Sequence, residues 1–361
     1  IEYASNSASE TTESALFGEI SYALADDLDV TLGLRKYNYE VETSSAVDLP
    51  LYNTVFKGRD PDSLIFTPKS ASSDKGGTLF KFNVSYRYSN TLMTYVTVSE
   101  GFRIGGANRV AACPDNIDEI ENQIICALPN EQIYIADTTT NYELGIKSTW
   151  LQSRFHFNVA LFNVDWEDAQ VSGITENGAV GILTNAEGAN SRGIEISSRA
   201  MLSDYLTAYT TYAYAKAELT ADAPNIYGGG VGAYDGERLP GTAEHQFSLG
   251  LNYQTELWDK VLDLNYGLTA QSDVYSTIGL NYGGETLPGY GTNNINAKLS
   301  GENWNATFYV TNLFDKYSFI SSNQSYDDIE SGNRGDIQRS YSHFILKPRT
   351  VGIKFSYQFG M

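Results

Sequence analysis

The sequence contains little of what marks a helical membrane protein or a nucleic-acid-binding protein. No run of eighteen apolar side chains occurs in its 361 residues, which excludes a membrane-spanning helix. Only 24 Lys and Arg residues stand against 44 Asp and Glu residues, which gives a net charge of −20. Because nucleic acid binds to a basic surface, this balance argues against nucleic acid as a partner. Helical periodicity is absent at any useful length.

The usual components of a catalytic site are also missing. Only three histidines occur, and His156, His245 and His343 are dispersed along the chain. There is no Gly-x-Ser-x-Gly nucleophile elbow. The glycine-rich stretch at 227–236 lacks both a Lys and the strand and helix that a phosphate-binding loop requires. We therefore expect no enzymatic activity and no cofactor.

Cysteine is scarce, with Cys113 and Cys126 thirteen positions apart in a stretch that contains Gly, Asn and Pro. This spacing suits one disulfide that closes a loop, which a chain-entropy estimate values at roughly 3 kcal/mol. A disulfide also indicates an oxidising compartment. A metal site is the alternative, but no His or third Cys lies nearby.

Alternation of apolar and polar side chains with a period of two recurs through almost the whole chain. In "WNATFYVT" (304–311), Trp304, Ala306, Phe308 and Val310 fall on one face of an extended strand, and Asn, Thr and Tyr residues fall on the other. Tyr (26) and Gly (32) are abundant. The fold class we predict is therefore all-β.

The alternation predicts thirteen strands of about ten residues or more. Strands of this length exceed those of ordinary soluble sheets and approach what a tilted membrane-spanning strand needs. The predicted strands lie at 13–25, 29–42, 75–89, 91–103, 137–151, 153–166, 191–203, 205–216, 242–256, 261–272, 289–301, 304–312 and 349–359.

The connections between these strands alternate strictly between short turns, such as "YSNT" (88–91), and long loops. This parity predicts a transmembrane antiparallel β-barrel of the outer-membrane type, with one face toward lipid and the other toward a hydrated lumen. A soluble sandwich or propeller is the alternative, but it gives no reason for long loops at alternate connections. The long loops are at 43–74, 104–136, 167–190, 217–241, 273–288 and 313–348.

Three segments resemble TonB-dependent outer-membrane receptors: "YVTVSEGFRIGGANR" (95–109), "VTNLFDKYSF" (310–319) and "KPRTVGIKFSYQF" (347–359). The resemblance implies a receptor in a Gram-negative outer membrane, surrounded by lipid and lipopolysaccharide. Such a receptor captures a solute with its loops and releases it inward when the TonB complex pulls on a plug domain. The implied solute is a ferric siderophore, with cobalamin, haem or an oligosaccharide as alternatives. A passive porin-like channel and a surface adhesin or structural barrel are rival functions.

Large receptors of this type have 22 strands around a plugged lumen. Counted back from the carboxyl end, the thirteen strands would be strands ten to twenty-two. We therefore expect residues 1–361 to be the carboxyl-terminal portion of the barrel, with the plug domain and first strands absent, because bare sheet edges are not tolerated in lipid. The chain begins "IEYASNSASE", without Met or a signal peptide. A smaller complete barrel is the alternative.

Six residues are candidates for ligand binding. Arg103, Asn108 and Arg109 lie where the fourth strand enters its loop, and Arg can bind carboxylate or phosphate through paired hydrogen bonds. Pairing with acidic loops or with lipopolysaccharide phosphate is the alternative. Loop aromatics either stack on a sugar or catecholate ligand or belong to the interfacial girdle. The aromatic residues selected are Tyr234, Tyr282 and Tyr326.

Charged residues on the polar face are costly in lipid but suit a polar interior. We expect most of them to pair with a plug domain or with neighbouring strands. Acidic residues crowd the segments 104–137 and 165–190, and no spacing there resembles a calcium-binding EF-hand loop. We expect these residues to form a solvated acidic rim or to bind divalent cations that bridge to lipopolysaccharide. The charged residues assigned to the polar face are Lys81, Arg87, Glu143, Lys147, Glu195, Arg199, Asp263, Lys298 and Lys354.

Overall fold

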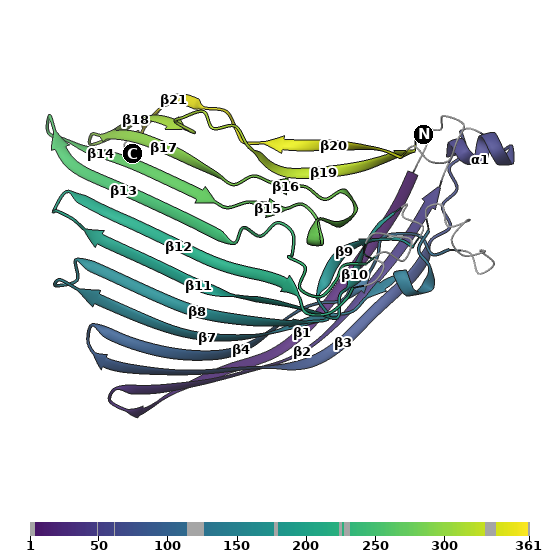
Figure 1. Cartoon of the computed structure of the whole chain (residues 1–361), viewed down its shortest axis with the longest axis horizontal. Coiled ribbons are helices and arrows are strands. Elements are labelled where there is room, and N and C mark those ends of the chain that lie inside the picture. Colours follow the sequence, from purple (N-terminus) through teal and green to yellow (C-terminus); the bar gives the residue numbers. More distant parts are fainter. Residues whose placement is uncertain are drawn as a thin grey trace.

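The computed structural model of the chain describes residues 4–48, 50–60, 62–113, 126–176, 180–223, 226, 232–328 and 337–359. Its main body is one antiparallel sheet of thirteen strands, which curves along its width (Figure 1). In sheet order the strands are β1 (Ala4–Ala25), β2 (Leu28–Asp48), β3 (Lys69–Ser89), β4 (Leu92–Arg103), β7 (Asp137–Trp150), β8 (Phe155–Glu167), β11 (Gly188–Met201), β12 (Leu206–Leu219), β13 (His245–Leu257), β14 (Lys260–Gln271), β17 (Tyr290–Ser300), β18 (Trp304–Thr311) and β21 (Thr350–Tyr357).

These are the thirteen strands predicted from the sequence, and from β4 onward their limits agree closely with the prediction. The first three strands are longer than predicted at the end where the long connections lie. β1 begins at Ala4, β2 ends at Asp48 and β3 begins at Lys69. Their extensions, such as "ASNSASETT" at 4–12, are polar on both faces. They therefore lack the alternation of hydrophobicity that identifies a strand in the sequence.

Within the described residues the sheet does not close on itself, because β1 pairs only with β2 and β21 only with β18. The six short turns lie at one end of the sheet and the long connections at the other, as predicted (Figure 1). We call these the turn end and the loop end.

The long connections contain small elements of their own. Four two-stranded ladders form there. A short helix also occurs, which the sequence had not indicated. Among the described residues, no helix is long and apolar enough to cross a membrane. The elements are the ladders β5 (Gly106–Ala107) with β6 (Ile133–Tyr134), β9 (Gln170–Ile174) with β10 (Gly181–Asn185), β15 (Val274–Tyr275) with β16 (Thr286–Leu287) and β19 (Phe319–Asp328) with β20 (Ile337–Ile345), the helix α1 (Pro50–Lys57), and the 3-10 helices η1 (Pro129–Glu131) and η2 (Ile278–Gly283).

The register of the sheet separates side chains into an apolar and a polar face. Leu144 of β7 is directly opposite Leu161 of β8, which is opposite Ile194 of β11. Leu144 and Leu161 are each 49% exposed, although they are apolar. Such exposure would be unfavourable in water but suits a surface in contact with lipid.

Toward the loop end, the apolar face changes to polar side chains. On β11 and β12, Arg192 and Lys216 form ion pairs with Glu218, at 3.0 Å for Arg192. Nearby, the side chain of Asn190 donates a hydrogen bond of 2.7 Å to Asp165. The apolar band therefore ends before the strands do, so that the strand ends project beyond it.

Tyrosine and glycine occur as directly opposed pairs on neighbouring strands of the polar face. Tyr95 lies opposite Gly145, and Tyr309 lies opposite Gly352. A Cβ atom at either glycine would overlap the tyrosine ring, which therefore lies flat over the glycine backbone. This packing gives one physical reason for the abundance of both residue types.

Buried side chains gather among the loops rather than in the middle of the sheet. β13, β14 and β17 contain no buried residue. At the loop end, by contrast, a cluster that includes Ala169, Leu219 and Ile278 is at most 4% exposed. A second cluster packs Tyr37 and Tyr39 under the connection that follows β4. The loops therefore form a small core of their own on the polar face.

Candidate functional site

We call the thirteen-stranded sheet the wall. The polar face of the wall contains a hollow of about 680 Å³ that extends from β4 to β17. Its floor consists partly of small residues, because Ala160 and Ala213 are directly opposite Glu195 on its two neighbouring strands. The carboxylate of Glu195 therefore stands among small side chains, with open space beside it. Amide and hydroxyl groups from β13 and β14, such as those of Gln246 and Thr269, complete the lining.

A second carboxylate, that of Glu143, lies at the β4 side of this hollow. The hydroxyl of Tyr95 donates a hydrogen bond to it, and the ammonium of Lys147 lies 5.2 Å from the centroid of the Tyr95 ring. Among the described lining residues, two carboxylates therefore face one ammonium group. The resulting negative charge suits a basic side chain or a cationic ligand.

Asp137 joins three strands at the loop end. Its side chain is 1% exposed and forms an ion pair with Arg103, whose Nε lies 3.0 Å from Asp137 Oδ2. The same carboxylate accepts hydrogen bonds from the indole N–H of Trp166 at 2.8 Å and the backbone N–H of Gln170 at 3.0 Å. The Arg103 guanidinium also lies 4.7 Å from the centroid of the Trp166 ring. Asp137 thus holds the end of β4 against β8 and β9.

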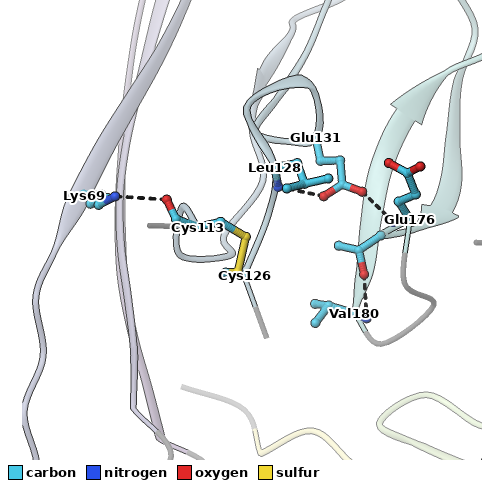
Figure 2. Close-up of a disulfide and its surroundings, with 8 residues drawn as sticks. Lys69, Cys113, Cys126, Leu128, Glu131, Glu176 and Val180 are labelled. Carbon is cyan, nitrogen blue, oxygen red and sulfur yellow. Dashed lines mark hydrogen bonds between the residues drawn. A yellow bond between two sulfur atoms is a disulfide. The ribbon is translucent and has the colours of Figure 1, made fainter. Parts of the chain in front are cut away.

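The predicted disulfide between Cys113 and Cys126 is confirmed, with an S–S distance of 2.05 Å. Figure 2 shows it next to Lys69, whose Nζ donates a hydrogen bond of 3.1 Å to the Cys113 carbonyl. On the far side, the buried carboxylate of Glu131 accepts hydrogen bonds from the backbone N–H groups of Leu128 and Glu176, at 2.7 and 2.6 Å (Figure 2). The disulfide therefore lies between β3 and the ladder of β9 and β10.

The expectation that the acidic residues of these loops form a solvated rim is wrong for Glu131 and Asp137. Both are buried, at 8% and 1% exposure, and both accept hydrogen bonds that shape the loops. Burial of a carboxylate is tolerated because each oxygen finds donors that replace water. These two acidic side chains therefore join loop segments to one another inside the protein.

The candidate ligand residues are found in different environments. Arg103 forms an ion pair with Asp137, in agreement with the alternative that it pairs with an acidic loop, although 52% of its side chain is exposed. Asn108 is buried. Its amide nitrogen donates to the carbonyls of Glu131 and Leu183, and its oxygen accepts from the Leu183 N–H, all at 2.8 Å. Its role in ligand binding, like that of Arg103, stays a prediction.

The remaining candidates are less constrained. Arg109 and Tyr234 are exposed to solvent in separate loops, with Tyr234 at 58%. The side chains of Tyr282 and Tyr326 lie outside the described part of the structure. Ligand contact by any of these four residues therefore remains a prediction.

The Asn-Leu-Phe-Asp-Lys motif after β18 has a structural role. Asn312 adopts a φ of 50°, and its side chain donates hydrogen bonds to the carbonyls of Lys316 and Lys347, at 2.9 and 3.0 Å. The Asp315 side chain accepts a hydrogen bond of 2.8 Å from the Arg349 N–H. Together these contacts fasten the end of β18 to the start of β21 and fix the base of the β19–β20 hairpin.

Arg87, a polar-face charge on β3, pairs with the neighbouring strand as predicted, through an ion pair with Asp29 of β2. Lys81 of β3 forms an ion pair of 2.8 Å with Glu19 of β1, across Gly33 of the intervening strand β2. No group of three or more His, Cys, Asp or Glu side chains suited to a metal ion occurs in the described ranges.

Several important residues were not identified from the sequence as site residues, in particular Trp166 and Gln170. Trp166 lies near the end of its strand, where an aromatic residue usually indicates an interfacial girdle. Only the hydrogen bond from its indole N–H shows that the ring points toward Asp137 instead. For Gln170 the sequence contains no signal.

The chain matches the family model described as "TonB dependent receptor-like, beta-barrel" over residues 2–313. Among similar solved structures is the ferric yersiniabactin uptake receptor FyuA from Yersinia pestis, with a TM-score of 0.74 and 18% identity over 99% of this chain and 47% of that chain. The ferric-catecholate import receptor Fiu from E. coli K12 has a TM-score of 0.68 and 18% identity, covering 98% of this chain and 45% of that chain.

The copper transporter OprC is also similar, with a TM-score of 0.63 and 13% identity over 97% of this chain and 50% of that chain. The chain therefore spans about half the length of these structures. At these sequence identities, the similarity establishes that the fold of the wall and its loops is shared, and nothing further.

Proposed function

Because this chain belongs to the TonB-dependent receptor β-barrel family, we propose that it forms part of a receptor that imports a scarce solute with energy transmitted by TonB. The chain is an outer-membrane protein, and its family consists of transporters rather than enzymes. The single observation that carries the proposal is the sheet itself. Thirteen strands keep an apolar face for lipid and a polar face for water, with all long loops at one end.

We further propose that residues 1–361 are the carboxyl-terminal part of a 22-stranded barrel with a plug domain. Two features support this. β1 and β21 each have one partner within the described residues, and a sheet edge in lipid leaves backbone groups without hydrogen bonds. Further strands of the same protein would satisfy both edges.

The hollow around Glu143 and Glu195 supports a plug on the polar face. Carboxylates that line a lumen need a counter-charge when water is displaced from them. Basic side chains of a plug would provide that charge, while the neutral amides and hydroxyls of β13 and β14 would allow the plug to slide. This use agrees with the expectation that polar-face charges pair with a plug.

For the solute, we propose a ferric siderophore captured at the loop end. Two of the similar solved structures are, by name, receptors for ferric yersiniabactin and for ferric catecholates. The alternatives are copper, because a copper transporter has the same fold, and cobalamin, haem or an oligosaccharide. Loops that carry their own buried core support capture, because a preorganised loop loses less conformational entropy on binding.

Two other functions make different predictions. A passive channel would conduct ions through the purified protein without TonB. An adhesin would contribute to surface attachment, and its deletion would leave solute uptake unchanged.

The decisive test is growth and uptake. A deletion strain would be supplied with single ferric siderophores as the only iron source, and uptake of radioactive iron would be measured with and without functional TonB. We expect uptake of one siderophore to require both this gene and TonB. Uptake without TonB would favour the passive channel, and unchanged uptake after deletion would contradict transport of the solutes tested.

A further inference from the structure

A second cavity, of about 480 Å³, lies among the loops at the loop end. Three connections line it: the residues from Trp166 to Ser172 at the junction of β8 and β9, the segment from Leu239 to Thr242 before β13, and the segment from Ser276 to Ile278 after β15. Three long connections that are distant in sequence therefore meet around one space. Among the described residues that line it, none is a sequence candidate for ligand binding.

The chemistry of the lining is apolar with hydroxyl groups. Trp166, Leu239, Pro240 and Ile278 provide flat or branched hydrocarbon surfaces, and Ser172 provides one of several hydroxyls. Among the described lining residues none is charged. A charged group would lose its hydration there without gaining a partner, so the lining favours an uncharged occupant.

We propose that this cavity binds one planar aromatic ring of the ligand, a ring that carries hydroxyl or carbonyl substituents. A volume of about 480 Å³ is at the lower end of ligand pockets and suits a ring group better than a whole metal chelate. Trp166 and Pro240 offer surfaces on which a ring stacks, and the hydroxyls suit its substituents. Assigning this ring to an imported chelate rests on the proposed function, whereas ring binding itself does not.

Arg103 and Asp137 are positioning residues for this cavity. Asp137 accepts the hydrogen bonds that fix two lining residues, from the indole N–H of Trp166 and the backbone N–H of Gln170. The guanidinium of Arg103 lies over the Trp166 ring and holds Asp137. The Gln170 side chain also donates hydrogen bonds of 3.0 Å to the carbonyls of Ile104 and Ile135. Arg103, which belongs to the "SEGFR" motif, thus orients the Trp166 ring that lines the cavity.

The test uses the protein purified from outer membranes of cells that carry the complete gene, with catechol as the probe. Of the four tryptophans in this sequence, Trp166 lies at the cavity, whereas Trp150, Trp258 and Trp304 lie at the turn end. We expect catechol to quench the fluorescence contributed by Trp166, obtained as the difference from the Trp166→Phe variant. Cyclohexane-1,2-diol, which has the same hydroxyls without the aromatic ring, is expected to give no saturable change.

Substitutions at one position then separate cavity filling from loss of a hydroxyl. Ser172→Phe should fill the cavity and raise the catechol dissociation constant about tenfold or more, because the added ring would occupy the space that the probe needs. Ser172→Ala should leave the constant within about twofold.

Arg103→Lys keeps the charge but loses the planar contact. It should shift the Trp166 emission maximum to longer wavelength and weaken catechol binding, effects that a stabilising role elsewhere in the wall would not produce.

The outcomes distinguish this inference from the proposed function. If catechol fails to quench Trp166, or if Ser172→Phe binds it as well as the unchanged protein, the ring site is wrong even when TonB-dependent uptake is intact. If quenching behaves as expected but no TonB-dependent uptake of any tested solute occurs, the ring site stands and the transport proposal fails.

Discussion

The wall and the loop end of this molecule are stabilised in different ways. In the middle of the wall, strands such as β13 and β14 contain no buried residue, and the sheet is held by backbone pairing. At the loop end, buried clusters, a disulfide and internal carboxylates hold irregular chain in place. The difference teaches that the bilayer replaces a protein core for the wall, whereas the loops lie in water and must build a core themselves.

The largest expected effect comes from breaking the apolar face. Ile146 lies midway between Tyr142 and Trp150 on β7 and is 43% exposed. Ile146→Arg should destabilise the protein in lipid vesicles by about 2–4 kcal/mol, because the charge would be placed near the middle of the bilayer. Denaturant unfolding in vesicles would measure this. Ser197→Arg on the polar face is the control, and an equal loss there would contradict the assignment of the faces.

A smaller effect is expected from breaking the Asp137 connection. Asp137→Asn should cost about 1–3 kcal/mol of local stability, because Asn has no charge to pair with Arg103 and replaces one of the two acceptor oxygens by an NH2 group. Hydrogen exchange of the loop amides, including that of Gln170, should become faster while exchange in β13 and β14 stays unchanged. Asp165→Asn, at an exposed acid of the same end, provides the matched control. Faster exchange throughout the wall would show that the two regions are not independent.

The tyrosine and glycine pairs allow a test of how much side-chain packing on the polar face stabilises the wall. Gly145→Ala should destabilise the wall by about 1–2 kcal/mol, because the added methyl group displaces the Tyr95 ring. In a protein that already carries Tyr95→Ala, the same change should cost much less, since the ring is gone. A double-mutant cycle of unfolding free energies measures this coupling. Equal costs in both backgrounds would mean that the ring does not lie over Gly145.

The smallest effect concerns pH at the far end of β2, beyond the apolar band. A hydrogen bond from Arg59 holds the pKa of the buried Asp48 carboxyl below its usual value of 3.8, against the effect of burial. A lowered pKa in the folded state gives stability that is present above pH 3.8 and is lost as the pH falls through the folded-state pKa. The protection factor for hydrogen exchange of the Ile65 amide, which donates to Asp48 at 2.9 Å, should decrease as the pH falls below 3.8. Asp48→Asn should remove this pH dependence.

Much of the wall was predictable because lipid and water impose a period of two on each strand. The limits of the strands from β4 onward followed from this period, and the disulfide followed from the spacing of two cysteines. The extensions of β1, β2 and β3 were missed because their two faces are both polar. The function of the Asn312 motif as a fastener of two strands was not predicted either, since it depends on contacts with Lys316 and Lys347.

The sequence by itself determined which side chains meet lipid and which meet water, because neighbours along a strand point to opposite faces whatever the rest of the chain does. Only the tertiary structure decided what the loop residues do. Arg103, Asp137 and Trp166 come from three different strands, and no pattern along the chain encodes their meeting. The geometry within one strand repeats and can be predicted from the sequence, but contacts between residues of different strands depend on how those strands pair.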